Sequence, residues 1–200
     1  MIELVLASGN LHKAEEINSL LDNGIFQVLA PKEKIEVDEN GDSFEKNAYL
    51  KANAYYQLEK SPVLSDDSGL IVEVLPGELG IHSARFGGEG LDDRGRAELL
   101  LEKMKDVPEE NRSAYFVCFL CFYLSKDEVY FFEGRLSGSI GTEYSGSGGF
   151  GYDPVFIPKK GVSGLSLASQ TDFKDKNSHR ALACLAANKF FSGKLGLDRP

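Results

Sequence analysis

Short apolar runs alternate with amphipathic segments along the chain, and this pattern predicts a mixture of strands and helices. The apolar runs are compact, and two of the longer ones are separated only by Ser125-Lys126-Asp127, as in a hairpin. The expected strands are Ile2–Ala7, Ile25–Ala30, Pro62–Ser65, Leu70–Leu75, Tyr115–Leu124 and Glu128–Phe132.

Apolar residues at helical spacing mark the remaining elements. We expect helices over Lys13–Asp22 and Leu91–Lys105, a helix begun by a capping-box-like pair of Asp42 and Glu45, and a final helix capped by Ser178. The inner stripes carry Phe44, Ala48, Ala52 and Tyr55 in the second helix and Leu182, Leu185 and Ala186 in the final one. Because hairpins replace strict alternation, the pattern predicts an α/β fold built on a mixed sheet, with residues 1–200 forming a single domain.

The composition is that of an ordinary globular protein, with 200 residues of which 42% are hydrophobic and 26% charged. No apolar run approaches the roughly 20 residues that span a bilayer, and no signal peptide is apparent, so we expect no membrane association. A net charge of −9 argues against a nucleic-acid partner, which needs a basic surface. Three cysteines, an odd number, give no disulfide framework and favour a reducing cytoplasm.

Cys118 and Cys121 form a C-x-x-C pair, which can indicate zinc or redox chemistry. Here the pair lies inside an apolar run, where residues three apart point to opposite faces of a strand. Cys184 falls in a separate helical segment. We therefore predict buried structural cysteines.

Ser65-Asp66-Asp67-Ser68-Gly69 is the most informative polar stretch, because it sits between two strand-like runs. Charge in such a place is costly to desolvate unless it is paired, solvated or bound to a metal. The pentapeptide is equally typical of a polar turn whose aspartates cap backbone groups. Taken alone it leaves both interpretations open.

Other stretches carry groups suited to a nucleotide. Ala7-Ser-Gly-Asn-Leu-His-Lys13 reads as a strand–loop–helix junction, which is either a phosphate site at a helix N-terminus or a simple capped helix entry. The glycine-rich stretch 146–154 offers Phe150 and Tyr152 as faces for a base. Cations at a helix start, as at His179 and Arg180, oppose the helix dipole unless an anion binds there.

Together these stretches describe a nucleoside triphosphate site. Glu39 and Asp67 supply oxygen ligands of the kind that Mg²⁺ takes while it bridges phosphates. A water made acidic by Mg²⁺ would suit an aspartate base, which is otherwise weak at neutral pH.

Seven blocks in order make the chain similar to the inosine/xanthosine triphosphate pyrophosphatases, which remove deaminated purine nucleotides. The blocks are Ala7-Ser-Gly-Asn-x-x-Lys13, Glu39-Asn-Gly-Asp-Ser-Phe44, Asn47-Ala-x-x-Lys-Ala52, Ser65-Asp-Asp-Ser-Gly-Leu70, Gly80-Ile-x-Ser-Ala-Arg85, Gly148-Gly-Phe-Gly-Tyr-Asp-Pro154 and Ser178-His-Arg180. The resemblance implies Mg²⁺-dependent hydrolysis of ITP, dITP and XTP to monophosphate and pyrophosphate, which keeps these nucleotides out of DNA and RNA. It also implies a homodimer and an elongated α/β fold, with a mixed sheet flanked by helices and an active-site cleft between two lobes.

Site roles follow from the resemblance by position. Asp67 resembles the general base and a Mg²⁺ ligand, with Glu39 as a second ligand. The substrate-binding residues implied are Ser8, Gly9, Asn10, Leu11, His12, Lys13, Ser68, Phe150, Gly151, Tyr152, Asp153, Lys174, His179 and Arg180. Of these, Ser8 to Lys13 and Ser68 would hold phosphates, and Phe150 would stack on the base. Asp66 is then structural or supports the site indirectly.

Two positions depart from the family pattern. Lys46 stands where the family has Glu, so Glu45 would have to replace that carboxylate if it supports the metal. Lys176 competes with Lys174 for the substrate. Two other functions stay open: a pyrophosphatase for modified pyrimidine or methylated nucleotides, and a nucleotide-binding module without catalysis.

Overall fold

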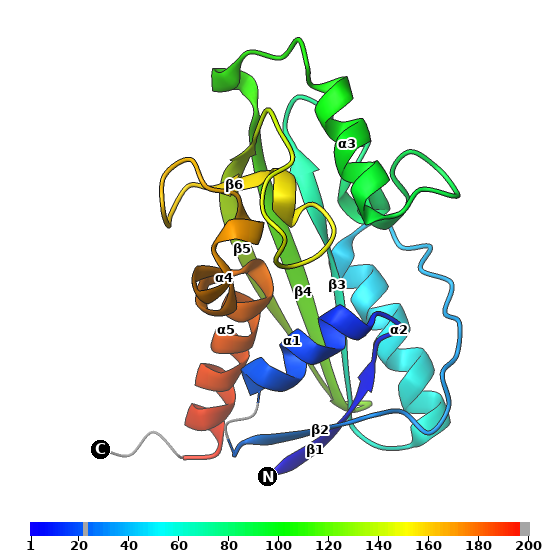
Figure 1. The fold of residues 1–200 in the computed structure, drawn as a ribbon. Helices are drawn as coiled ribbons and strands as arrows, with labels where there is room; N and C mark the ends of the chain where they lie inside the picture. Colours follow the sequence, from blue (N-terminus) through cyan, green and yellow to red (C-terminus); the bar gives the residue numbers. More distant parts are fainter. Residues whose placement is uncertain (22–23, 197–200) are drawn as a thin grey trace. The chain divides into compact units, whose positions relative to one another are not determined.

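The protein is described by a computed structural model that covers residues 1–21 and 24–196 (Figure 1). Its strands are β1 (Ile2–Ala7), β2 (Phe26–Leu29), β3 (Val63–Val72), β4 (Ser113–Ser125), β5 (Glu128–Ile140) and β6 (Phe156–Pro158). Its α-helices are α1 (Leu11–Leu21), α2 (Phe44–Glu59), α3 (Asp93–Lys103), α4 (Thr171–Asn177) and α5 (His179–Lys194). Short 3₁₀ helices lie at Gly80–Arg85, Glu109–Asn111, Asp153–Val155 and Leu167–Ser169.

The strands form a mixed six-stranded sheet in the order β2-β1-β3-β4-β5-β6. β1 runs parallel to β2 and β3, whereas β5 and β6 are antiparallel. Sheet and helices together confirm the predicted α/β fold with a mixed sheet. The chain divides into two compact units, of which unit 1 comprises 1–67, 118–134 and 179–200, and unit 2 comprises 68–117 and 135–178.

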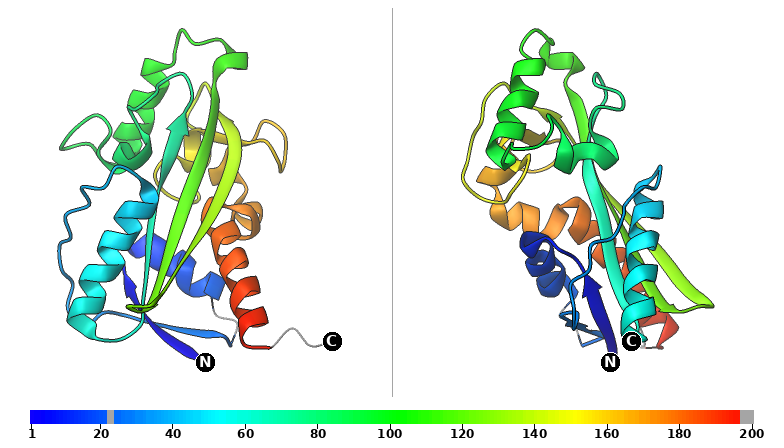
Figure 2. Two further views of the ribbon diagram at one scale, coloured as in Figure 1. Left: turned by 180° about the vertical axis from the view of Figure 1, so that it is seen from behind. Right: turned by 90° about the vertical axis from the view of Figure 1, so that its right-hand side faces the viewer.

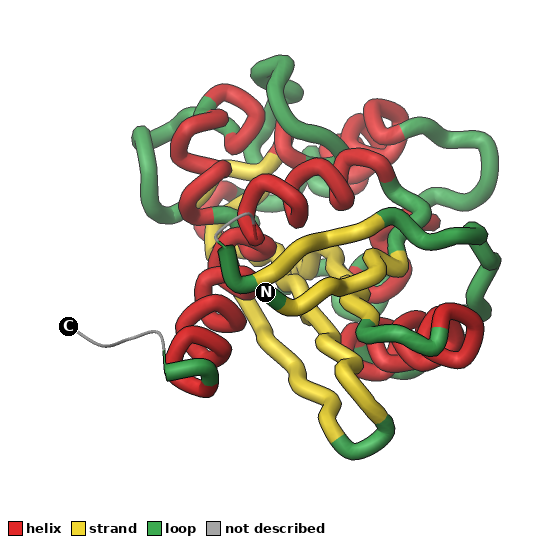
Figure 3. The backbone as a smooth tube through the Cα atoms, turned by 90° about the horizontal axis from the view of Figure 1, so that it is seen from below, coloured by secondary structure: helices red, strands yellow, loops and turns green. Residues whose placement is uncertain are grey.

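Helices cover both faces of the sheet within unit 1 (Figures 2 and 3). Successive side chains of a strand point to opposite faces, so β1 places Leu4 and Leu6 in one apolar cluster and Val5 and Ala7 in another. The first cluster includes residues of α1 and α5, and the second includes residues of α2. A polar side chain of β3 therefore faces either α1 and α5 or α2.

Unit 2 has its own apolar core. α3 contributes Ala97 and Leu100, and its C-cap residue is Met104; all three pack with residues from the parts of β3, β4, β5 and β6 that belong to this unit. Arg112 is 3% exposed in this core, and its guanidinium donates to the carbonyl oxygens of Met104, Val107, Ile140 and Gly141. These bonds tie the end of α3 to the end of β5 without a carboxylate.

The largest difference from the sequence prediction concerns the aspartate stretch. Val63–Val72 is one uninterrupted strand, so the expectation of two strands separated by a turn was wrong. The reason is that both aspartates are buried in a setting that tolerates them: Asp66 pairs with Lys13 and Arg180, and burial raises the pKa of Asp67, which favours its neutral form. The β4–β5 hairpin is as predicted and longer than expected.

Other expectations need smaller corrections. Ser43, and not Asp42, caps α2, because its side chain accepts a hydrogen bond from the Lys46 amide. Leu185 on α5 is 62% exposed. The helix instead buries the face formed by Ala183, Cys184, Ala187 and Phe191. Asp22, the expected last residue of the first helix, lies outside the described residues.

The cysteines match their prediction. Cys118 lies in the cluster with α1 and α5, and Cys121 in the cluster with α2, so they are on opposite faces of β4. Both are free and buried, as is Cys184, and burial raises the pKa of the Cys121 and Cys184 thiols to about 12. In the described part of the chain, none of the helices has the length and apolar character needed to cross a membrane.

Candidate functional site

The alternation of β3 separates its two aspartates. Leu64 belongs to the cluster with α1 and α5, while Val63 belongs to the cluster with α2 and Ser65 donates to the Ala48 carbonyl of α2 over 2.6 Å. By the same period of two, Asp66 faces α1 and α5, and Asp67 faces α2. Two neighbouring carboxylates thus meet two different environments.

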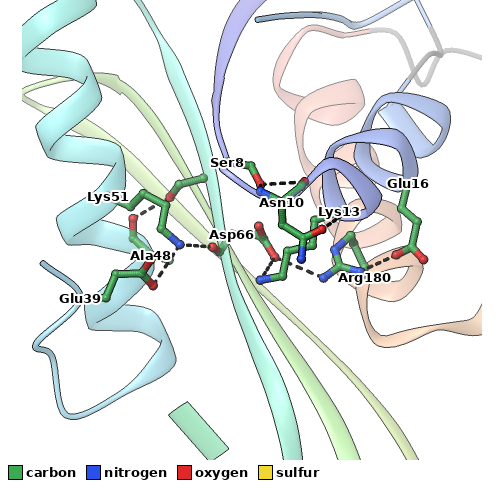
Figure 4. Close-up of polar contacts among 10 residues, drawn as sticks. Ser8, Asn10, Lys13, Glu16, Glu39, Ala48, Lys51, Asp66 and Arg180 are labelled. Atoms are coloured by element: carbon green, nitrogen blue, oxygen red, sulfur yellow. Dashed lines mark hydrogen bonds and ion pairs between the residues drawn. The ribbon is translucent and has the colours of Figure 1, made fainter. Parts of the chain in front are cut away.

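Asp66 is the hub of a buried ion-pair network (Figure 4). Its carboxylate lies 3.1 Å from the Lys13 ammonium of α1 and 3.3 Å from the Arg180 guanidinium of α5, and Arg180 also pairs with Glu16. Burial alone would raise the pKa of Asp66, but Lys13, Arg180 and Lys51 lower it well below its usual range. Asp66 is therefore ionised and joins α1, β3 and α5.

Asp67 has the opposite character. Asp67 is 8% exposed, and burial raises the pKa of its carboxyl to about 6. The charges of Glu39 and Asp66 add to this rise, while those of Lys13 and Lys51 oppose it. A carboxyl with this pKa is protonated more readily than an ordinary aspartate and is a stronger base once ionised. The two neighbouring aspartates of β3 therefore have pKa values shifted in opposite directions.

Lys51 of α2 links the two aspartates to Glu39. Its ammonium lies 3.0 Å from the Glu39 carboxylate and donates to the backbone carbonyl of Asp66 over 2.9 Å (Figure 4). Burial alone would lower the pKa of Lys51, but the charges of Asp66, Glu39 and Asp67 raise it. Lys51 is thus a fixed positive charge beside the two candidate metal ligands.

The donor set fits Mg²⁺ only together with a substrate. Among the described residues, no three histidine, cysteine, aspartate or glutamate side chains gather in a way that would hold a metal. Glu39 is close enough to Asp67 for its charge to raise the pKa of that carboxyl. Two carboxylates completed by phosphate oxygens are a usual Mg²⁺ environment. Glu45, the carboxylate that would have to replace the family's Glu at position 46, is exposed on α2.

The Ser8–Lys13 stretch forms the start of α1. The Asn10 side chain accepts a hydrogen bond from the Lys13 amide over 3.2 Å, and Ser8 bonds to the backbone of Asn10. The capped helix entry is therefore present, and it leaves Gly9, Leu11 and His12 exposed. Capping and phosphate binding are compatible, because only part of the first turn's donors is used by the cap.

His179 and Arg180 open α5 and are 5% and 1% exposed. α5 begins directly after Ser178, whose extended backbone suits a residue in the N-cap position. Gly134 of β5 allows the helix to approach closely, since a Cβ there would lie 2.0 Å from the carbonyl oxygen of His179. The Asp66 and Glu16 carboxylates, rather than solvent, surround the Arg180 cation.

Unit 2 brings together the residues expected to meet the base. The Lys174 ammonium is 2.8 Å from the Asp153 carboxylate and 4.8 Å from the centre of the Phe150 ring. Asp153 also accepts the Phe150 amide over 2.9 Å. Lys174 is buried, whereas its rival Lys176 is exposed.

Tyr152, which is buried, and Gly151, which is partly exposed, anchor this loop to other parts of unit 2. The Tyr152 hydroxyl donates to the Ser83 carbonyl over 2.7 Å, and the residue is 6% exposed within the core. Gly151 has a φ of 61° and donates its amide to the Asp93 carboxylate over 3.0 Å. Both residues fix the position of Phe150 through the backbone. Ser68 is half-buried at the start of the unit 2 part of β3.

Sequence reasoning missed Lys51 and Glu16 as members of the unit 1 cluster. Glu16 follows Lys13 by three positions, so both lie on one face of α1, a spacing that identifies neighbours on a helix. Lys51 stands in the Asn47–Ala52 block, four positions after Asn47. Neither spacing shows that the residue meets the aspartates, because that depends on how β3 is placed between the helices.

Comparison with known proteins gives consistent matches along nearly the whole chain. A dITP/XTP pyrophosphatase from Leptospira interrogans is 41% identical over 197 residues, covering 96% of this chain and 98% of the relative. One from Treponema denticola is 40% identical over 198 residues, covering 96% and 100%. The Ham1 protein structures of Staphylococcus aureus and Coxiella burnetii superpose with TM-scores of 0.83 and 0.87 at 34% and 29% identity. Both matches cover 96% of this chain, and they cover 99% of the Staphylococcus aureus chain and 100% of the Coxiella burnetii chain.

The family of those proteins also matches the sequence directly. The Ham1 family accounts for residues 4–190, which include every candidate site residue named above. With such coverage and relatives at 41% identity, this chain belongs to the Ham1 family.

Proposed function

We propose that the protein is a nucleoside triphosphate pyrophosphatase that hydrolyses deaminated purine nucleotides, ITP, dITP and XTP, to the monophosphate and pyrophosphate. The observation that carries the proposal is the buried Asp67 carboxyl on the α2 side of β3, near the Lys51–Glu39 ion pair, and burial raises its pKa to about 6. The family relatives named dITP/XTP pyrophosphatase supply the substrate class. In the cell such an activity would keep deaminated purines out of DNA and RNA.

The chemistry assigned to unit 1 is proton transfer and phosphate binding. Asp67 takes a proton from the water that attacks the α–β phosphoanhydride, a task suited to a base with a pKa near the working pH. Lys13 pairs with Asp66 and Lys51 pairs with Glu39, and the charges of both lysines oppose the rise in the pKa of Asp67. These two ammonium groups offer positive charge to phosphate oxygens. Glu39 and Asp67 would hold Mg²⁺, which when bound neutralises phosphate charge and makes a bound water more acidic.

The base is assigned to the Phe150, Asp153 and Lys174 cluster of unit 2. Phe150 offers a face for stacking, and Lys174 is a pure hydrogen-bond donor beside it. A donor there suits the 6-oxo group of hypoxanthine and xanthine and penalises the 6-amino group of adenine. Guanine shares the 6-oxo group, so GTP is the more demanding competitor.

The proposed setting is a homodimer in the cytoplasm. Three free, buried thiols suit a reducing compartment. The net charge of −9 is unsuited to nucleic acid, so the proposed partner is the small nucleotide itself. Gel filtration combined with light scattering measures the assembly directly.

A substrate panel tests the activity. With Mg²⁺, we expect kcat/KM for pyrophosphate release from ITP, dITP and XTP to exceed that from ATP by at least about a hundredfold, because the 6-amino group of adenine leaves the donor of the site unpaired. We expect a smaller preference over GTP, because guanine shares the 6-oxo group, and we expect pyrimidine triphosphates to be poorer substrates than ITP. The assay quantifies pyrophosphate and orthophosphate separately, with and without EDTA. Equal turnover of all substrates, or orthophosphate as the product, contradicts the proposal. Preferred turnover of a modified pyrimidine would reassign the substrate.

A further inference from the structure

Residues 31–43, which we call the Glu39 segment, have no regular secondary structure, yet they run along α2 (Figures 1 and 2). A segment without its own hydrogen-bond ladder needs partners for its backbone groups. Its side chains alternate over part of its length, with Ile35, Val37, Glu39 and Gly41 partly buried and the residues between them exposed. The segment is therefore extended, with one face turned inward.

The partners come from one face of α2. Asn47, Lys51, Tyr55 and Glu59 are spaced four apart, so they form a continuous polar row along the helix. Such a row on a helix that also carries an apolar stripe is usually solvated. Here Asn47, Tyr55 and Glu59 are only 1%, 3% and 6% exposed. Their burial indicates that the row has a structural partner, and the partner is the Glu39 segment.

Each member of the row contacts the segment, in antiparallel order. The Glu59 carboxylate accepts the Lys32 amide over 2.8 Å, and the Tyr55 hydroxyl accepts the Ile35 amide and donates to the Ile35 carbonyl. Lys51 pairs with the Glu39 carboxylate. The Asn47 side chain accepts the Gly41 amide over 2.8 Å. The contacts flank Glu39 on both sides.

The approach at Gly41 is too close for a side chain. A Cβ at this position would lie 2.6 Å from the side-chain oxygen Oδ1 of Asn47 and 2.7 Å from Cγ of Lys46. Packing supplements the polar row, because Ile35 and Val37 contact the same apolar cluster as Ala48, Ala52 and Tyr55. Apolar and polar contacts thus determine one position of the segment along α2.

We propose that Asn47, Tyr55 and Glu59 are positioning residues that fix the Glu39 segment on α2 and so hold the Glu39 carboxylate beside Lys51 and Asp67. None of the three touches the candidate reacting groups. Their effect is to limit the motion of the loop that carries Glu39, the candidate metal ligand. The expected effect on catalysis rests on the proposed function, whereas the anchoring of the Glu39 segment to α2 does not.

Tyr55→Phe is the sharpest test, because it deletes one hydroxyl and keeps the ring in the core. Tyr56→Phe is the matched control: Tyr56 is the next residue of α2, and its ring packs on Tyr123. Hydrogen exchange of the metal-free protein measures the segment itself. We expect the Ile35 amide to exchange about fivefold faster or more in Tyr55→Phe, the effect of losing one net hydrogen bond, and to be unchanged in Tyr56→Phe.

The Mg²⁺ dependence of pyrophosphate release measures the consequence. For Tyr55→Phe we expect the Mg²⁺ concentration at half-maximal rate to rise about threefold to tenfold, while kcat at saturating Mg²⁺ changes less than twofold. Gly41→Ala perturbs the same contact from the segment side and should shift both measurements in the same direction. Glu59→Gln keeps an oxygen for the Lys32 amide and should retain more protection than Glu59→Ala.

Each outcome decides a separate point. Unchanged exchange in both Tyr55→Phe and Gly41→Ala overturns the positioning role. Faster exchange with an unchanged Mg²⁺ requirement overturns the link from the segment to Glu39. If the wild-type protein releases no pyrophosphate from any nucleotide, the proposed function fails, and the exchange data still decide whether the polar row holds the segment.

Discussion

Replacing Asp67 with Asn is expected to lower kcat for ITP by at least about a thousandfold, within the range for loss of a general base. The amide keeps the size of the side chain but neither accepts the proton of the attacking water nor offers a charged oxygen to Mg²⁺. Nucleotide binding should remain within a few-fold of wild type, because the lysines and the Phe150 cluster are untouched. Stopped-assay pyrophosphate release and calorimetric titration with ITP measure the two effects.

Asp127→Asn is the control, because Asp127 is an exposed aspartate of unit 1 in the β4–β5 turn. It should leave kcat unchanged. Normal turnover in Asp67→Asn would remove Asp67 from the chemistry. A protein that binds ITP tightly but releases no pyrophosphate even with Asp67 intact would instead be a binding module.

Asp67→Asn should also stabilise the metal-free protein at neutral pH. The raised pKa of Asp67 means that the folded state binds more protons than the unfolded state between about pH 4 and pH 6. Wild-type stability therefore falls as the pH rises through this window and stays lowered above it, and the Asn variant lacks the fall. In EDTA we expect a higher Tm for Asp67→Asn at pH 7.5 and a much smaller difference near pH 4.

Replacing Asp66 with Asn should damage the fold rather than only the reaction. It removes the carboxylate from Lys13 and Arg180 in a site where Asp66 is 1% exposed, and one-sided removal of a buried ion pair costs about 3 to 5 kcal/mol. Urea unfolding followed by circular dichroism measures the loss. The Asp127→Asn control should change the free energy of unfolding by less than about 0.5 kcal/mol.

Acid provides an independent check on Asp66. Its lowered pKa means that the unfolded state binds more protons below about pH 4, so the stabilisation is complete above that pH and is lost as the pH falls. The stability difference between wild type and Asp66→Asn should shrink as the pH drops from 5 to 2. A constant difference over that range would show that the carboxylate charge of Asp66 does not contribute to the free energy of unfolding.

The sequence was most informative where a local pattern decides the outcome. Ile2–Ala7, the stripe Phe44, Ala48, Ala52 and Tyr55, and the opposed faces of Cys118 and Cys121 follow from periods of 2 and 3.6, and the structure confirms them. The prediction of a turn at the aspartate stretch was wrong because turn propensity is a local property. The ion pairs that stabilise Asp66 inside a strand come from α1 and α5, which are distant in sequence.

Side-chain partners of the site were beyond the reach of sequence reasoning for the same reason. Lys174 and Lys176 are equivalent by spacing, and only packing shows that the first is buried against Phe150 and Asp153. Leu185 was expected on the inner stripe of α5, yet it is exposed, and Ala183, Cys184 and Ala187 pack instead in the cluster that contains β1 and β4 residues.

The continuity of β3 constrains how the chain can change in length. The strand is held in register with β1, with Val5 opposite Val63 and Ala7 opposite Ser65. Inserting or deleting one residue between Val63 and Asp66 would exchange the faces of the two carboxylates, presenting the ion-pair partner to α2 and the candidate base to α1 and α5. The spacing of this strand is therefore under as strict a constraint as the identity of its aspartates.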